Sequence, residues 1–207
     1  MMKPMYLPTV EQNPKPGPFA DAMREMQAAG GEYPQIWHLF AFRPEATSHL
    51  VRFTQEIMRG PAPLTPAFRE LIAAYTSARN ATPFCMKSHA VVAAVLLERE
   101  RGAACDAASL VQEVVRDFET SRLDEKEKNL FRFIDKVNYS PADITAEDLE
   151  SLRVSGWEDE AIYYAITICA LFNFYNRWVE ASGVHPLSDE AHRRRWTWSP
   201  DAAYIRK

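Results

Sequence analysis

Two Thr-Pro pairs, at 65–66 and 82–83, constrain the fold of this chain more than any other feature of its sequence. Threonine is favoured at the N-cap of a helix, and proline is favoured at the first helical position because its fixed φ suits a helix start. Apolar residues recur at helical spacing after each pair, which predicts helices over about 66–80 and 83–101. Helices joined by so short a connection usually pack antiparallel.

Helical spacing continues along most of the chain, and no stretch alternates between apolar and polar residues as a half-buried strand would. We therefore expect an all-α fold of eight to ten helices. The further helices are expected at residues 19–29, from 34, 44–58, 107–118, 123–138, 145–156 and 158–181. Residues 1–17 are expected to form an extended arm, because four prolines oppose a helix there.

Two of these helices carry specific expectations about burial. The helix from Pro44 should bury Leu50, Phe53 and Ile57, which share one face. The stretch 158–181 is apolar on nearly every side, so it needs cover on both sides. We expect one side to face the core and the other to meet a second subunit, which predicts a homo-oligomer.

The whole chain is expected to divide into three parts: an N-terminal arm and first helix (1–33), a helical domain (34–183) and a C-terminal tail (184–207). The net charge of −4 argues against a nucleic-acid partner, because phosphate contacts need clustered Lys and Arg. The basic run Arg193–Arg195 beside Trp196 and Trp198 is interpreted as a solvated tail, and the tail's aromatic residues indicate a packing surface.

The sequence has neither a signal-peptide pattern nor a membrane-spanning stretch, and this bears on the compartment of the protein and the redox state of its thiols. The first residues have no apolar core of signal-peptide length, and no window approaches the length of a membrane span. We expect a cytoplasmic protein with no membrane partner, in which thiols stay reduced. The odd number of cysteines disfavours a structural disulfide framework, so Cys85, Cys105 and Cys169 are considered separately.

Three reactive side chains gather on the two helices that follow the Thr-Pro pairs: Glu70 on the first, and Cys85 and His89 on the second. Residues four apart share a helix face, so Cys85 and His89 lie together. At 1.5 Å rise per residue, Glu70 lies about 13 Å from the bend, His89 about 9 Å and Cys85 about 3 Å. This order suits a proton relay, in which the carboxylate orients the imidazole and the imidazole takes the thiol proton, directly or through a water.

Cys85 should also fall in the first turn of its helix, where the helix dipole tends to lower a thiol pKa. Other interpretations stay open, because a single cysteine or histidine is often only a packed core residue. A metal site built from Glu70, Cys85 and His89 would lack an obvious fourth ligand, so neither a metal nor a cofactor is expected. Cys169 is interpreted as a packing residue and Cys105 as exposed. No partner is evident from spacing for His38, His49, His185 and His192.

The pattern Glu70-Leu-Ile-Ala-Ala-Tyr, Asn80, Phe84-Cys85 and Ser88-His89 resembles the alkylhydroperoxidase D and carboxymuconolactone decarboxylase superfamily. It is most similar to the branch of peroxidase-related enzymes, and the resemblance covers about residues 34–183. The resemblance implies an all-helical fold, homo-oligomers such as dimers, trimers or hexamers, and reduction of peroxides by a Cys-x-x-Cys pair. In that scheme the second Cys attacks the peroxide, the first resolves it, and the Glu and His relay protons.

This chain departs from the pattern at Thr82, which stands where the family has its resolving Cys. We interpret Thr82 as a helix cap, and Cys85 as a single attacking thiol that forms a sulfenic acid. Resolution would then need Cys105, Cys169, another subunit's Cys or an external thiol reductant. The leading hypothesis is a thiol-dependent peroxidase-related oxidoreductase acting on a peroxide or other small molecule. The alternatives are a non-redox acid/base enzyme of the carboxymuconolactone decarboxylase type and a non-catalytic redox-sensing oligomer.

Overall fold

The computed structural model describes residues 3–188, 190–192 and 204–205, and within these ranges the chain is all-α. Ten α-helices and three 3-10 helices have bounds within the described residues, which also include the helical residues 190–192 and contain no strand. The α-helices are α1 (Pro8–Gln12), α2 (Pro18–Ala28), α3 (Trp37–Phe42), α4 (Pro44–Arg59), α5 (Pro66–Arg79), α6 (Pro83–Arg101), α7 (Ala107–Asp117), α8 (Glu125–Tyr139), α9 (Ala146–Val154) and α10 (Asp159–Ser182). The 3-10 helices are Ala103–Cys105, Phe118–Thr120 and Pro141–Asp143. The predicted all-α class is confirmed.

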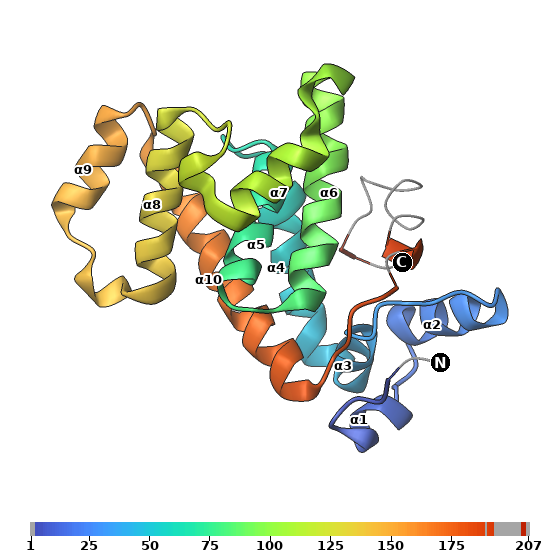
Figure 1. The fold of residues 1–207 in the computed structure, drawn as a ribbon. Coiled ribbons are helices and arrows are strands. Elements are labelled where there is room, and N and C mark those ends of the chain that lie inside the picture. The colour runs from blue at the N-terminus through green and yellow to red at the C-terminus, as the bar shows by residue number, and fades with distance from the viewer. Residues whose placement is uncertain (1–2, 189, 193–203, 206–207) are drawn as a thin grey trace.

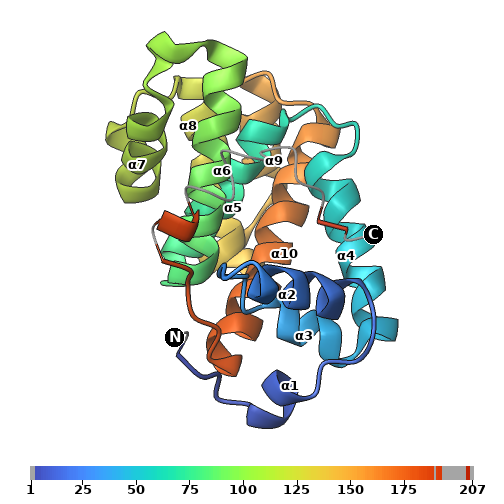
Figure 2. The same cartoon turned by 90° about the vertical axis from the view of Figure 1, so that its right-hand side faces the viewer.

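Helix α5 lies at the centre of the molecule, and both views place it between α6 and α10 (Figures 1 and 2). Every residue from Ala67 to Ser77 is buried, so α5 is covered on all sides. Its small residues, Ala73 and Ala74, have no exposed surface, which lets neighbouring helices approach closely. The α8–α9 pair lies beyond one end of α10, and α1–α3 lie at its other end (Figure 1).

Both helix starts fall where the Thr-Pro pairs predict them, but only one threonine caps its helix. The Thr65 hydroxyl accepts a hydrogen bond from the Phe68 N–H at 3.2 Å. Thr82 is at the N-cap position of α6, yet its hydroxyl donates to the Asn80 carbonyl at 3.3 Å and makes no cap bond. The bend requires Ala81 at φ +51°, and this sharp reversal turns the Thr82 hydroxyl back toward the preceding residues. Thr82 therefore occupies the predicted N-cap position of α6, but it does so without a side-chain cap bond.

The N-terminal arm is not wholly extended, because Pro8 starts the short helix α1. Proline is tolerated at the first helical position, where its missing N–H would have had no intrahelical partner. The arm also packs against the end of α10: Met5 is buried, and the Tyr6 N–H donates to the Ser182 carbonyl at 3.0 Å. The prolines therefore limit the length of the helix without preventing it.

The buried face of α4 is rotated from the predicted one. Of the three predicted residues, Ile57 is buried and Leu50 packs partly buried against the core, but Phe53 is 45% exposed. Val51 and Thr54 are buried instead. The reason is a polar contact that apolar spacing does not reveal: the Thr54 and Tyr175 hydroxyls are hydrogen bonded at 2.7 Å inside the core. Helix α10 was expected to be covered on both sides. In the single chain one side packs against the core, and the outer face carries the exposed Tyr163, Ile166 and Phe174.

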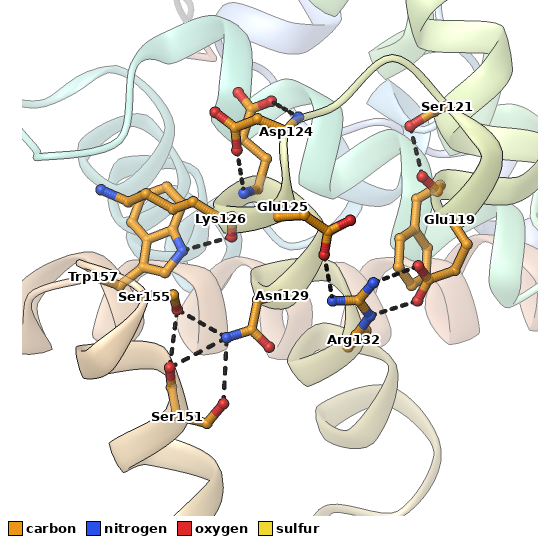
Figure 3. A network of polar contacts seen from close by, with 12 residues as sticks. Glu119, Ser121, Asp124, Glu125, Lys126, Asn129, Arg132, Ser151, Ser155 and Trp157 are labelled. Carbon is orange, nitrogen blue, oxygen red and sulfur yellow. Dashed lines mark hydrogen bonds and ion pairs between the residues drawn. The ribbon is translucent and has the colours of Figure 1, made fainter.

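The end of the molecule farthest from α1–α3 is held by polar contacts around the start of α8 (Figure 3). Asp124 and Glu127 form a capping box at that start. The Trp157 indole N–H donates to the Lys126 carbonyl at 2.9 Å, and Lys126 lies over the indole ring. The Trp157 contacts join the start of α8 to the segment between α9 and α10. No helix within the described residues has the length and apolar character needed to span a membrane.

Candidate active site

Glu70 and His89 meet between α5 and α6, as their heights above the bend predict. The Glu70 Oε2 and His89 Nδ1 atoms are 2.5 Å apart. Glu70 is completely buried, and the His89 side chain is 13% exposed. The imidazole also packs edge-on against Phe172 of α10, with ring centroids 4.4 Å apart. The pair is thus enclosed by three helices, with only the imidazole reaching toward the surface.

Two further residues, Arg59 and Tyr204, complete the environment of Glu70. The Arg59 guanidinium lies 2.6 Å from Glu70 Oε1. The Tyr204 hydroxyl donates to the same oxygen at 2.9 Å. Neither residue has a spacing to Glu70 that would reveal it: Arg59 ends the preceding helix, and Tyr204 comes from the far end of the chain.

The charges around Glu70 keep it ionised despite its burial. Burial alone would raise the pKa of this carboxyl, but Arg59 and His89 outweigh that effect and hold the pKa at about 2. A group with so low a pKa cannot exchange protons near neutral pH. Glu70 therefore acts as a fixed negative charge that orients its neighbours.

The contact with Glu70 also fixes the chemistry of His89. An ionised carboxylate can only accept a hydrogen bond, so Nδ1 of His89 must carry the proton that it donates. In the neutral ring this leaves Nε2 as the unprotonated nitrogen, the form that a general base requires. A carboxylate likewise holds the tautomer of the catalytic imidazole in the Ser-His-Asp hydrolases.

Cys85 lies at the start of α6 as predicted, but its electrostatic environment is opposite to the expected one. The residue is only 3% exposed. Burial, together with the negative charge of Glu180, raises the pKa of its thiol far above the ordinary range. Desolvation disfavours the thiolate more than the helix dipole favours it, so the expected lowered pKa is wrong. No hydrogen bond joins Cys85 to His89 within the described parts of the chain.

The other two cysteines are free thiols: Cys105, expected to be exposed, is only partly exposed, and Cys169 is buried. About 24 Å of α6 separates Cys85 from Arg101 at the helical rise, and Cys105 follows only four residues later. A disulfide needs Cα atoms within about 7 Å, so Cys105 cannot resolve Cys85 of the same chain. Cys169 is fully buried, and its thiol lies 3.9 Å from the Ile134 carbonyl oxygen. Burial raises the pKa of this thiol to about 11. The interpretation of Cys169 as a packing residue agrees with this position.

Three of the other four histidines have surroundings that do not include Glu70, and the fourth, His192, is buried. His38 is hydrogen bonded to the Tyr33 hydroxyl at 3.0 Å, His49 is exposed on α4, and His185 packs edge-on against Tyr6. Across the described residues, no three His, Cys, Asp or Glu side chains converge closely enough to hold a metal ion. The predicted basic and aromatic run, Arg193–Arg195 with Trp196 and Trp198, lies outside the described residues.

Comparison with known proteins gives matches in structure only. No protein-family model matches the chain, and no curated protein matches it in sequence. An uncharacterized peroxidase-related protein from Silicibacter sp. TM1040 superposes with a TM-score of 0.76 at 24% identity, covering 92% of this chain and 95% of that one. An uncharacterized peroxidase-related protein with an alkylhydroperoxidase AhpD core, from Ralstonia eutropha JMP134, gives 0.71 at 22% identity, with 93% of each chain covered.

A third match has a described ligand. It is a variant of the debrominase Bmp8 in complex with 2,3,4-tribromopyrrole, with a TM-score of 0.58 at 18% identity, covering 93% of this chain and 91% of that one. At these identities the matches establish the fold, and they agree with the resemblance carried by the Glu70, Cys85 and His89 pattern. The chain has the alkylhydroperoxidase D-like fold of the peroxidase-related proteins.

Proposed function

We propose that the protein is a thiol-dependent oxidoreductase in which Cys85 is the nucleophile and the Glu70–His89 pair moves its proton. The observation that carries this proposal is the buried 2.5 Å contact between Glu70 and His89, one helical turn along α6 from the Cys85 position. Glu70 holds the proton on Nδ1, so His89 presents a basic nitrogen. A base is required here, because the buried Cys85 thiol is protonated at rest.

The first chemical step follows from these protonation states. The imidazole of His89 takes the thiol proton through a bridging water as the Cys85 sulfur attacks one oxygen of a peroxide, ROOH. The O–O bond breaks, the sulfur is oxidised to a sulfenic acid, and the departing alkoxide receives the proton from His89 as ROH. Glu70 stabilises the imidazolium between the two transfers and stays ionised throughout. Thiol and peroxide are thus converted to sulfenic acid and alcohol.

Because Thr82 has no thiol, the sulfenic acid of Cys85 must be reduced by a thiol from elsewhere. An external thiol reductant attacks the sulfenic sulfur, releases water and leaves a mixed disulfide on Cys85. A second reductant thiol attacks the mixed disulfide, restores the Cys85 thiol and leaves as the oxidised reductant. We propose an external thiol because Cys105 is too distant in the same chain and Cys169 is deeply buried.

The substrate class is less narrowly defined than the nucleophile. We propose a peroxide, because the site resembles that of the peroxidase-related branch. The structural similarity to a debrominase bound to a brominated pyrrole supports a wider range of small electrophiles. Either substrate would have to reach the nearly enclosed Cys85, so it must be small or must displace neighbouring side chains.

A second candidate function is favoured by the high pKa of the Cys85 thiol. In a non-redox acid/base enzyme of the carboxymuconolactone decarboxylase type, His89 would exchange a proton with a small organic substrate, and Cys85 would only line the site. The two functions differ in their dependence on sulfur. Cys85→Ser should abolish turnover of peroxide with an external thiol, whereas it should have a mild effect on acid/base turnover that His89→Gln abolishes.

We further propose a cytoplasmic homo-oligomer that uses the outer face of α10. Tyr163, Ile166 and Phe174 are 57%, 36% and 48% exposed on this face and share a helical stripe. A second copy of the chain would cover them. Replacing Ile166 and Phe174 by Glu should therefore reduce the molar mass measured by light scattering, and an unchanged mass would argue against this surface.

Peroxide turnover with an external thiol tests the proposed function. We expect consumption of hydrogen peroxide or an organic hydroperoxide in the presence of dithiothreitol, with loss of activity in Cys85→Ser. A Cys105→Ser variant is the matched control, since it also removes one thiol and lies at the opposite end of α6. Equal turnover by wild type and Cys85→Ser would contradict the proposal.

A further inference from the structure

The C-terminal residue Tyr204 reaches the centre of the candidate site, although 134 positions separate it from Glu70 in the sequence. Its hydroxyl donates to Glu70 Oε1 at 2.9 Å. Its ring lies nearly parallel to the His89 ring, at 14° with centroids 6.5 Å apart. One aromatic side chain thus contacts both members of the proposed proton relay.

Further contacts fix Tyr204 in this position. The Arg59 guanidinium lies over the tyrosine ring, 5.2 Å from its centroid, while it also pairs with Glu70. The Tyr204 backbone N–H donates to the Gln55 side-chain oxygen at 2.7 Å. Both Gln55 and Arg59 belong to α4, so this helix supplies the support for the tyrosine.

The two carboxylate oxygens of Glu70 accept hydrogen bonds from different residues, and this indicates the role of Tyr204. Oε1 accepts from both Arg59 and Tyr204, whereas Oε2 faces Nδ1 of His89. A carboxylate held at one oxygen by two donors cannot rotate freely about its terminal bond. Its second oxygen is therefore kept in the direction of the imidazole, which requires a proton on Nδ1.

Tyr204 is suited to this task because its hydroxyl keeps its proton. Burial, followed by the neighbouring Glu70 charge, raises the pKa of this phenol well above 10. It therefore donates to the carboxylate at every pH at which the protein would work. A phenol that could ionise would instead repel Glu70 and release it.

We propose that Tyr204 is a positioning residue of the active site, which acts through Glu70 to hold His89 in the tautomer with an unprotonated Nε2. This inference rests on the proposed function for its catalytic meaning. Its structural content, the control of the His89 tautomer from the end of the chain, can be tested without any substrate. The failure of one proposal is therefore distinguishable from the failure of the other.

The decisive variant is Tyr204→Phe, which removes one oxygen atom and keeps the ring. Imidazole ¹⁵N resonances distinguish the two neutral tautomers, and His89→Gln identifies the His89 signals among the five histidines of the chain. We expect one tautomer, protonated at Nδ1, in the wild type, and a mixture in Tyr204→Phe. Tyr139→Phe is the matched control because Tyr139 is 60% exposed at the end of α8 and its hydroxyl also donates a hydrogen bond, to the Arg79 carbonyl. This variant should leave the spectrum unchanged.

Activity provides the second arm of the experiment. We expect Tyr204→Phe to lower kcat about tenfold or more with little change in KM, because a misaligned base slows the chemical step more than binding. A His89 spectrum identical to that of the wild type would overturn the proposal, whatever the activity. A shifted spectrum with unchanged turnover would keep the positioning contact and would contradict the proposed role of His89.

Chemical rescue separates the hydroxyl from the ring volume. In Tyr204→Ala, added phenol can restore both the ring and the donor, whereas added anisole restores only the ring. We expect phenol alone to recover the wild-type His89 tautomer. Equal recovery with anisole would show that filling the space is sufficient, and this result would overturn the proposal.

Discussion

The carboxylate of Glu70 lies 2.5 Å from the imidazole of His89, and each residue comes from a different helix of the pair that joins at Ala81. Glu70 has no exposed surface, so this contact is formed away from water. In such surroundings a charge-assisted hydrogen bond is stronger than on the surface, and losing one partner costs more. The stability and the proposed chemistry of the protein therefore depend on the same pair.

Replacement of Glu70 by Gln should destabilise the fold. The change keeps the size of the side chain but removes the negative charge that faces Arg59 and His89. Breaking a buried ion pair in this way typically costs about 3–5 kcal/mol. Urea denaturation would measure the change in the free energy of unfolding. The control is Glu119→Gln, which breaks a half-exposed pair with Arg132 and should cost less than about 1 kcal/mol.

Acidification should remove the stability that the ionised Glu70 carboxylate contributes to the folded protein. The pKa of Glu70 is about 2 in the folded protein, against an ordinary value of 4.5. A depressed pKa stabilises the folded state above the ordinary value, and this stability is lost as the pH falls from about 4.5 to 2. The loss amounts to about 3 kcal/mol. Denaturation curves across this range should show it in the wild type, and the absence of any difference from Glu70→Gln would contradict the assignment.

Cys85 should react slowly with alkylating reagents at neutral pH. Its thiol is buried and its pKa is raised, so little thiolate is present. In a protein carrying Cys105→Ala and Cys169→Ala, the rate of iodoacetamide labelling should stay low at pH 7 and still be rising at pH 9. The reference thiol is the partly exposed Cys105, measured in a protein that carries Cys85→Ala and Cys169→Ala. A rate that levels off below pH 7 would mean that the thiol is ionised at rest.

Restoring the family's resolving cysteine should change how Cys85 is regenerated. Thr82 and Cys85 lie three residues apart at the start of α6, and both are buried. In Thr82→Cys, the new thiol should attack the sulfenic acid and close a disulfide within the chain. Peptide mapping after one equivalent of peroxide would detect this bond. Its absence, with Cys85 still oxidised, would show that this bend cannot adopt disulfide geometry.

The sequence predicted the parts of the site that follow from local rules. The Thr-Pro pairs located the starts of α5 and α6, and the helical rise placed Glu70 opposite His89. The motif also directed attention to the alkylhydroperoxidase D-like fold that the solved structures share. Each of these inferences uses spacings within a single stretch of 37 residues, from Thr65 to Arg101.

Several features that the sequence did not predict depend on distant contacts. Arg59 and Tyr204 enter the site from other elements, and no spacing rule connects them to Glu70. The pKa of Cys85 was predicted with the wrong sign because its position in the helix is local, whereas its burial is a property of the folded chain. Thr54 likewise faces the core because Tyr175, far along the sequence, offers a partner for its hydroxyl.

The measurement that tests the central claim most directly is the trapping of oxidised Cys85 during peroxide treatment. Dimedone reacts with a sulfenic acid, and mass spectrometry of the digested protein identifies the labelled cysteine. We predict that one equivalent of peroxide labels Cys85, that Cys85→Ser abolishes the label, and that His89→Gln slows its formation at least tenfold. Labelling of Cys105 instead, or no labelling of Cys85 while peroxide is consumed, would contradict the account.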